Sequence, residues 1–439
     1  MKPQNFEERV VWYTFLGSYP LYLAGLIFIV NTTVPWVLLL YLFKKMWQQP
    51  NAETADSKIR IPAIIWLWIV CMVMMLIAIL IGLVDFGYDL KEIIRSTLNW
   101  MRDWALFALL PLLGCTLQIR PQLIYRATCQ LCLQSLFIIP ICCFAYFAQL
   151  PNLLYTSPLE RLTQNGTIFY EIQLYIKEVD SGGLRLALFT PWGPALGLLS
   201  CMFFMFALQE TDKKWKWIGL IGSVIMLILS VSRGAYIFLP TTLLLVWGLQ
   251  NFTRPVVQIG AGIGIFLGGL FSTTLIEGLT ASIDSFKNAR KSSSQLREAL
   301  ERTALDRWPD APIWGHGKQI QGAPVFKEMP IGSHHTWIGL LFTQGVVGFL
   351  AFAIPLGYTI ILLAIKMHQS KLAKVGLSVL LLILLASMSD NIEKLAYVYW
   401  SGLLIVGIAL KPSPIASSSV SSSNLYPADT HSNVVQPAE

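Results

Sequence analysis

Three clusters of polar residues stand at the ends of long apolar runs, where polar side chains are costly and therefore mark candidate functional sites. The first is Arg185, with two glycines just before it and two prolines soon after it. The second is Ser232-Arg233-Gly234, in a short turn between two apolar runs. The third is the pair His334-His335, which precedes a further run. These residue types suit anion binding and proton transfer.

An arginine held below a membrane surface needs an anionic partner, and the planar guanidinium group binds phosphate oxygens in a bidentate manner. The runs on either side of Arg233 contain no carboxylate, so a phosphate-bearing ligand is the expected partner. A neutral imidazole at His334 or His335 can accept a proton from a hydroxyl group. Structural roles remain open beside these: a headgroup contact for Arg185, carbonyl capping for Arg233 and ordinary hydrogen bonds for the histidines.

The composition places these clusters in a membrane protein. Of the 439 residues, 55% are apolar and 13% are charged, against roughly 25% charged in an ordinary soluble domain. The apolar residues fall into runs long enough to cross a bilayer. Much of the net charge of +7 lies in short loops beside these runs. The positive-inside rule accounts for that placement, so no nucleic-acid partner is implied.

The apolar runs predict an all-α polytopic membrane protein with about 12 transmembrane helices and both termini in the cytoplasm. The polar stretch 31–35 is either an outside turn between the first two spans or a kink in one tilted helix, and loop charge favours two spans. The runs cover residues 10–30, 33–43, 61–84, 98–117, 127–148, 186–207, 217–231, 235–250, 256–275, 345–365, 375–388 and 395–410.

Two polar segments on the outside face are too long to be hairpin turns, and they divide the chain. In the second, the stretch from Ser294 to Trp308 has apolar residues at helical spacing, which predicts an amphipathic helix resting on the membrane surface or on the bundle. The expected units are N-terminal spans (1–148), a first long loop (149–185), central spans with the arginine turn (186–275), a large helical loop (276–336), three C-terminal spans (337–410) and a disordered cytoplasmic tail (411–439).

Four motifs occur in order within residues 180–350. His334-His335 is followed after nine residues by Gly345-x-x-Gly348, and Ser232-Arg233-Gly234 precedes them. The segment from Arg185 to Ala195 and the later Ser294-x-x-Arg297 complete the set, the last followed by Ile313-Trp-Gly315-His-Gly317. This set resembles the H-[NSQ]-x9-G-x-x-G, S-R-G, R-x-x-x-x-F-x-x-P-N-x-x-A and P-x-x-G-x-G motifs of the lipopolysaccharide O-antigen ligase and polymerase superfamily. Two positions depart from it: 335 is His where Asn, Ser or Gln is usual, and 192 is Trp where Asn is common.

The resemblance implies a membrane glycosyltransferase of the bacterial cytoplasmic (inner) membrane, with its active face and both long loops in the periplasm. Its donor would be a glycan linked to undecaprenyl pyrophosphate, and its acceptor a hydroxyl group of lipid A-core or of a growing polysaccharide, among membrane lipids. We expect His334 to act as general base, Arg233 and Arg297 to clamp the pyrophosphate, and Arg185 to assist. The supporting residues would be His335, Arg302, Ser232 and Trp337. The transfer would invert the anomeric centre and use no metal or cofactor, and the chain has no D-x-D triplet.

Several alternatives stay open. Ligase and polymerase share carrier and motifs, and the doubled histidine leaves open which imidazole is the base. A secondary transporter for a small anion is a further reading, against which stand the missing internal repeat and the large outside domain. A zinc site would need more ligands than the histidine pair and His316. The Cys129-x-x-Cys132 pair lies in a predicted span and is read as buried apolar cysteine, and the charges between Asp85 and Asp103 as interface pairs.

Overall fold

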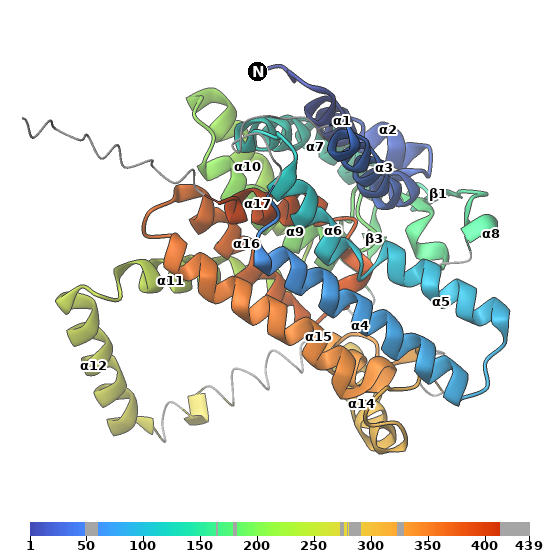
Figure 1. The fold of residues 1–439 in the computed structure, drawn as a ribbon. Coiled ribbons are helices and arrows are strands. Elements are labelled where there is room, and N and C mark those ends of the chain that lie inside the picture. Colours follow the sequence, from blue (N-terminus) through green and yellow to red (C-terminus); the bar gives the residue numbers. More distant parts are fainter. Residues whose placement is uncertain are drawn as a thin grey trace, which may run out of the picture.

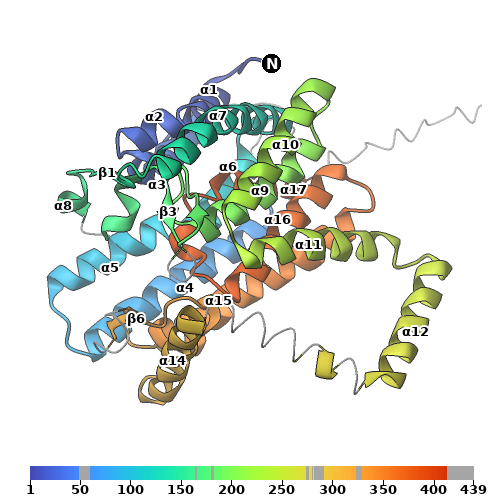
Figure 2. The ribbon, with the colours of Figure 1, turned by 180° about the vertical axis from the view of Figure 1, so that it is seen from behind.

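The computed structural model describes residues 1–48, 60–163, 166–178, 182–272, 276–278, 280, 291–322 and 329–412, without the side chains of 162 and 291–294. Helices dominate these residues and pack into a bundle, from which α12 projects (Figures 1 and 2). The expected disordered tail falls on 411–439, of which 413–439 lie outside the described residues.

Most helices follow one another with short connections; the exceptions are the two long loops and the segment 48–62. They are α1 (Phe6–Leu16), α2 (Ser18–Leu23), α3 (Ile27–Trp47), α4 (Ala63–Asp85), α5 (Leu90–Arg102), α6 (Leu106–Thr116), α7 (Pro121–Phe147), α8 (Glu160–Thr163), α9 (Gly193–Leu208), α10 (Lys213–Leu229), α11 (Arg233–Asn251), α12 (Pro255–Leu270), α14 (Lys291–Arg307), α15 (Thr336–Lys366), α16 (Lys371–Ser387) and α17 (Trp400–Leu410). Short 3-10 turns are η2 (Thr167–Phe169), η3 (Trp308–Asp310) and η5 (Glu393–Leu395).

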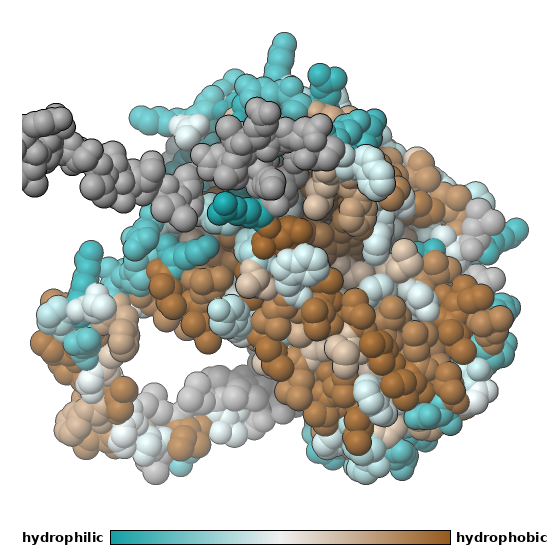
Figure 3. All heavy atoms as spheres, in the orientation of Figure 1, coloured by the Kyte–Doolittle hydropathy of each residue, from teal (hydrophilic) through white to brown (hydrophobic). Residues whose placement is uncertain are grey.

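Four described helices, α3, α4, α7 and α15, are long and apolar enough to cross a membrane. A broad hydrophobic surface lies over the α4 and α15 side of the molecule in Figure 3. Exposed apolar side chains such as Val70 on α4 and Ile361 on α15 belong to these helices. The shorter apolar helices include α9, α12 and α17. The chain is thus a helical membrane protein, and length alone does not establish the expected count of about twelve crossings.

The N-terminal region has neither a turn at residues 31–35 nor a single helix over residues 10–43. Residues 31–35 lie inside α3, and the chain before it is divided between α1 and α2. The side-chain amide of Asn31 is buried and donates to the carbonyl oxygen of Tyr397, which explains a polar residue at this depth. The chain instead turns before α3 at Gly25, whose φ of +68° suits glycine and whose absent side chain leaves room for Ser157.

Two other expected spans differ from the structure. The run 98–117 is divided between α5 and α6, with the break at residues 103–105. The run expected at 345–365 is the second part of α15, which begins at Thr336 and is kinked at Gly345, where the backbone is not helical. The C-terminal unit still contains three helices, α15, α16 and α17.

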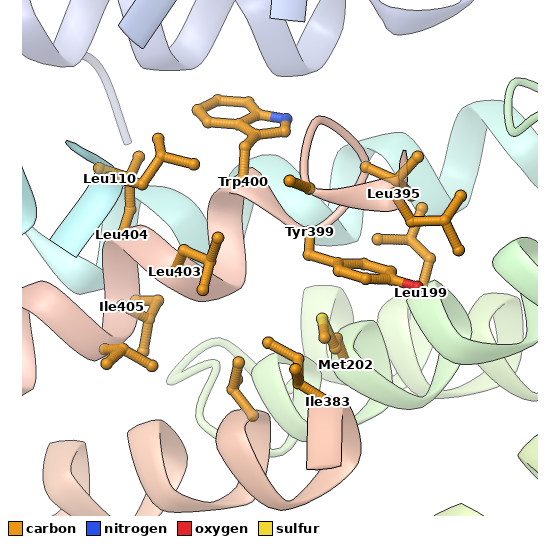
Figure 4. Packing of buried hydrophobic residues seen from close by; sticks show 14 of the residues in the cluster. Leu110, Leu199, Met202, Ile383, Leu395, Tyr399, Trp400, Leu403, Leu404 and Ile405 are labelled. Carbon is orange, nitrogen blue, oxygen red and sulfur yellow. The ribbon is translucent and has the colours of Figure 1, made fainter. Parts of the chain in front are cut away.

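The core lies where α6, α9, α16 and α17 meet. Figure 4 shows Leu199 and Met202 of α9, Ile383 of α16 and Leu403 of α17 side by side in it. Every residue of α17 is buried. Glycines let α6 and α17 approach closely: a Cβ atom on Gly407 would lie 2.2 Å from the carbonyl oxygen of Pro111. Small residues of this kind are the usual means of close helix packing in membranes.

The two cysteines of the C-x-x-C pair have a packing role. Both are buried on α7, facing α10. A Cβ atom on Gly219 would lie 2.6 Å from the sulfur of Cys129, and one on Gly222 would lie 2.8 Å from Cβ of Cys132. The spacing of the cysteines therefore matches the spacing of two glycines on the neighbouring helix.

The long loops contain short antiparallel strand pairs, so the all-α description is wrong in this detail. In the first loop β1 (Leu153–Thr156) pairs with β2 (Glu171–Gln173), and β3 (Ile176–Lys177) with β4 (Leu184–Arg185). In the second loop β5 (Ile320–Gln321) pairs with β6 (Pro330–Ile331). Strands of two to four residues are too short to show the alternating pattern by which a sequence indicates a strand.

The amphipathic helix expected at 294–308 is α14, and its apolar stripe rests on the bundle. Leu300 and Ala304 are fully buried and form a small core with Ile331 and with Phe342 of α15. Of the two expected resting places, the structure thus shows the bundle (Figure 1). This contact brings the large loop against the start of α15.

Candidate functional site

The three arginines of the motifs line one cavity. Its volume is about 280 Å³, and it lies between the start of α9, the turn from α10 to α11, the middle of α14 and the end of α16. The polar lining consists of Arg185, Ser232, Arg233, Arg297, Ser389 and Asp390, and the apolar lining includes Pro194, Leu198, Ile237, Phe238 and Ala386. Residues more than 200 positions apart in the chain therefore meet at a single site.

Arg185 ends β4 and is held by the turn that follows α10. Its Nε atom donates a hydrogen bond of 3.0 Å to the carbonyl oxygen of Ser230. Gly193 leaves the space for this side chain, because a Cβ atom there would lie 2.2 Å from the Nε atom. Burial lowers the pKa of Arg185, and the charge of Arg297 lowers it further, while the carboxylate of Asp390 opposes both effects. Two guanidinium groups therefore repel each other across the cavity.

The turn from α10 to α11 presents Arg233 to the cavity. Ser232 is the N-cap of α11, and its hydroxyl oxygen accepts a hydrogen bond of 3.4 Å from the backbone N–H of Ala235. Gly197 of α9 lets the turn approach, since a Cβ atom there would lie 2.6 Å from that of Ser232. Arg233 is the first residue of α11 and is half-buried.

Left-handed backbone occurs at non-glycine residues in three of the segments around the cavity. Leu188 has a φ of +52°, Val231 of +46° and His334 of +67°. Only one other non-glycine residue of the described chain, Gln149, has a positive φ. Such residues are strained by about 1–3 kcal/mol each and persist where the surrounding structure holds them.

Arg297 joins α14 to the bundle. Its Nη1 atom donates a hydrogen bond of 3.1 Å to the carbonyl oxygen of Ser389, just beyond the end of α16. The arginine therefore reaches from the large loop into the cavity, as the expected role requires. Arg302, five residues later on the same helix, points elsewhere: it pairs with Glu298 and its side chain is 74% exposed. Arg302 is expected to support the site, but it is not among the residues that line the cavity.

His334 lies beside the cavity and is not part of its lining. Burial and the nearby charge of Arg297 lower the pKa of His334 to about 4. The imidazole is therefore neutral at pH 7 and able to accept a proton. A Cβ atom on Gly332, two residues earlier, would lie 3.2 Å from Phe342, so the loop that carries His334 packs tightly on α15.

The residues after His334 fix the start of α15. His335 is the N-cap, and its Nδ1 atom accepts a hydrogen bond of 3.4 Å from the N–H of Ile338. The indole N–H of Trp337 donates to the hydroxyl of Ser387 at 2.8 Å. Arg297 contributes to the lowered pKa of His334 but not to that of His335, whose side chain caps α15.

The glycines after the histidine pair receive the end of the large loop. Gly345 has a φ of +62°, and a Cβ atom there would lie 2.2 Å from the carbonyl oxygen of Ile313. Gly315 has a φ of +72°, and a Cβ atom there would lie 2.4 Å from the backbone nitrogen of Gln344. The two motifs that are distant in sequence thus form one backbone contact, which requires glycine on both sides.

Asp390 is a site residue that the motifs did not indicate. Its Oδ2 atom accepts a hydrogen bond of 3.0 Å from the indole N–H of Trp192, and its Oδ1 atom accepts one of 2.9 Å from the backbone N–H of Asn391. Burial raises the pKa of this carboxyl group, and the two hydrogen bonds oppose that shift. In the sequence, the feature that could have indicated Asp390 is a short charged gap between two apolar runs, from Asp390 to Lys394.

Thr336 connects the histidine segment to Asp390. Its hydroxyl donates a hydrogen bond of 2.7 Å to the carbonyl oxygen of Asp390 and accepts one of 3.1 Å from the N–H of Ile392. The same short gap also carries a partly buried ion pair between Lys394, whose side chain is 32% exposed, and Asp103. This pair agrees with the reading of Asp103 as an interface charge, now against the C-terminal unit.

A comparison with known families matches part of the chain. Residues 218–353 match the family model described as O-Antigen ligase. No curated protein matches the chain. The matched segment includes Arg233, Arg297 and His334, whereas Arg185 and Asp390 of the same cavity lie outside it. The resemblance found in the motifs is thereby confirmed.

Proposed function

We propose that this membrane protein, whose residues 218–353 match the O-antigen ligase family model, transfers a glycan from an undecaprenyl-pyrophosphate carrier to an acceptor hydroxyl group. The observation that carries the proposal is the cavity. Three guanidinium groups and one carboxylate are among the described residues that line it. A pyrophosphate diester carries two negative charges, and the planar guanidinium group binds phosphate oxygens in pairs.

The chemistry follows from these groups. His334 accepts the proton of the acceptor hydroxyl, whose oxygen attacks the anomeric carbon of the donor sugar. The bond from that carbon to the phosphate oxygen breaks, and the carrier pyrophosphate leaves with the electron pair. Arg233, Arg297 and Arg185 stabilise the charge that develops on the leaving group. Attack on the side opposite the leaving group inverts the anomeric centre.

The neighbourhood of His334 suits this sequence of events. The charge of Arg297 disfavours an imidazolium ion when the cavity holds no anion. The departing pyrophosphate brings negative charge to the same arginine, which offsets that repulsion as the proton arrives. Proton transfer and leaving-group departure thereby support each other.

Helix direction supports an active face in the periplasm. The cavity lies at the N-terminal ends of α9 and α11 and the C-terminal end of α16. Lys213 at the start of α10, Lys366 at the end of α15 and Lys371 at the start of α16 stand at the opposite helix ends. Basic residues favour the cytoplasmic side of an inner membrane, so we place the cavity on the other side.

The test is a gel of surface polysaccharide from a strain that lacks this gene, complemented with wild-type chain, His334→Ala or Arg302→Ala. We expect wild type and Arg302→Ala to restore the glycan and His334→Ala to fail. Long polymer accumulating on the carrier with a bare acceptor would identify a ligase, and acceptor carrying single repeats would identify a polymerase. An unchanged profile in every strain would contradict the proposal and favour an anion transporter.

A further inference from the structure

The carboxylate of Asp390 shares a cavity with three arginines but binds other partners. Its two oxygens accept hydrogen bonds from Trp192 and from the backbone of Asn391. Arg185 and Arg297 in turn donate to the carbonyl oxygens of Ser230 and Ser389. Among the described residues, no ion pair within 4.0 Å joins Asp390 to either arginine.

This separation matters because direct contact between Asp390 and an arginine would compete with an anionic ligand. At a distance, the carboxylate opposes the effect of the Arg297 charge on the pKa of Arg185. In direct contact, it would form a bidentate pair with a guanidinium group and occupy the N–H groups that a phosphate needs. A carboxylate that is held at a distance therefore leaves these N–H groups to the ligand, and one that is released competes for them.

We propose that Trp192 is a positioning residue that holds Asp390 away from the arginines and so keeps them available for the pyrophosphate of the donor. The proposal rests on the function proposed above. Trp192 directly precedes α9 in an extended conformation, and its ring packs on Phe169 with centroids 6.0 Å apart. Phe169 of η2 thus holds the ring in place, and the indole N–H reaches Asp390 of the cavity.

The test measures binding of inorganic pyrophosphate to the full chain in lipid nanodiscs by calorimetry. Trp192→Phe keeps an aromatic ring against Phe169 and removes the N–H donor. We expect this variant to bind pyrophosphate about tenfold more weakly, the equivalent of one hydrogen bond redirected. Asp390→Asn should bind as tightly as wild type or more tightly, because the competing charge is gone. Trp217→Phe, at a ring that is 64% exposed on α10, is the matched control.

The double variant Trp192→Phe/Asp390→Asn separates positioning from packing. If Trp192 acts through Asp390, the double variant should bind like Asp390→Asn alone. Binding as weak as that of Trp192→Phe would show that the indole acts through packing, and unchanged binding in Trp192→Phe would show that the N–H is irrelevant; either result overturns the proposal. A wild-type chain that does not bind pyrophosphate, or that binds it equally after Arg233→Ala, overturns the anion-binding cavity of the proposed function itself.

A transfer assay gives a second readout. With Trp192→Phe, the KM for the lipid-linked donor should rise about tenfold while kcat stays within a factor of about two, because the defect lies in access to the arginines. The Asp390→Asn change in the same background should lower that KM again. A loss confined to kcat contradicts the positioning role.

Discussion

Arg297 on α14 and Ser389 beyond α16 are joined by a hydrogen bond of 3.1 Å between a guanidinium group and a carbonyl oxygen. The bond ties the large loop to the bundle at the cavity itself. The same arginine lowers the pKa of His334, so it connects the anion site with the proposed base. A long loop thereby contributes to the proposed reaction centre.

Arg297→Ala should lower the transfer rate by roughly 100-fold or more, as the loss of a charged donor to a leaving group typically does. Arg302→Ala on the same helix removes an exposed arginine outside the cavity and should leave the rate unchanged. Donor consumption by the two purified variants measures this. Equal losses would mean that α14 acts through its overall charge and not through one side chain.

The titration of His334 should differ from that of an ordinary histidine. Its pKa of about 4 lies below the usual 6.5, so the neutral base is present at every pH above about 5. Activity should therefore stay flat from pH 8 down to pH 6 and fall only in more acidic buffer. Arg297→Gln should move the titration of His334 upward, because one of the two causes of the shift is removed. Proton NMR of the imidazole, assigned with His334→Gln, follows the titration of His334 in wild type and in Arg297→Gln. A midpoint near 6.5 in wild type contradicts the structure.

Gly193→Ala should displace Arg185 and weaken pyrophosphate binding about tenfold, a loss of the size expected from overpacking at one site. The new methyl group would lie 2.2 Å from the Nε atom of the arginine. Gly248→Ala on α11 meets no atom within 4 Å and serves as the control. Calorimetry with inorganic pyrophosphate compares them, and equal affinities would show that Arg185 does not hold the anion.

Gly345→Ala should lower the free energy of unfolding by about 1–3 kcal/mol, because it places a side chain at positive φ and against a carbonyl oxygen. The loop around Ile313 should then be cut more readily by protease. Gly357→Ala lies on the same helix with no atom within 4 Å and should have no such effect. If both variants melt and digest like wild type, the contact between the loop and α15 is not a significant part of the fold.

The motifs predicted which residues gather better than they predicted how the chain turns. Arg185, Arg233 and Arg297 are expected on one side, and they share a cavity. Arg185 precedes α9, Arg233 begins α11, and Arg297 comes from the middle of α14, which packs on the bundle. The helix at 294–308 followed from its apolar spacing. In contrast, the turn favoured at 31–35 lies within α3, since a polar stretch in a helix and one in a loop look alike until the partner of Asn31 is known.

Asp390 and Trp192 show what a single sequence leaves out. Asp390 lies in none of the motifs, and no motif indicates that it meets Trp192. The contact between them joins positions 198 residues apart. Trp192 even departs from the Asn that is common in the resembled family. Both side chains can donate an N–H, so the departure is compatible with the hydrogen bond to Asp390, but that compatibility becomes visible only when the carboxylate is in place.

The left-handed backbone at Leu188, Val231 and His334 has a consequence for engineering this protein. Glycine adopts such a conformation freely, so replacing Leu188 or Val231 with glycine would relieve conformational strain at those positions. It would also remove the side chains that fix the segments carrying Arg185 and Arg233. A heat-resistant variant found in this way would gain its resistance at the expense of turnover, and selection for robustness is therefore better directed at the helix ends remote from the cavity.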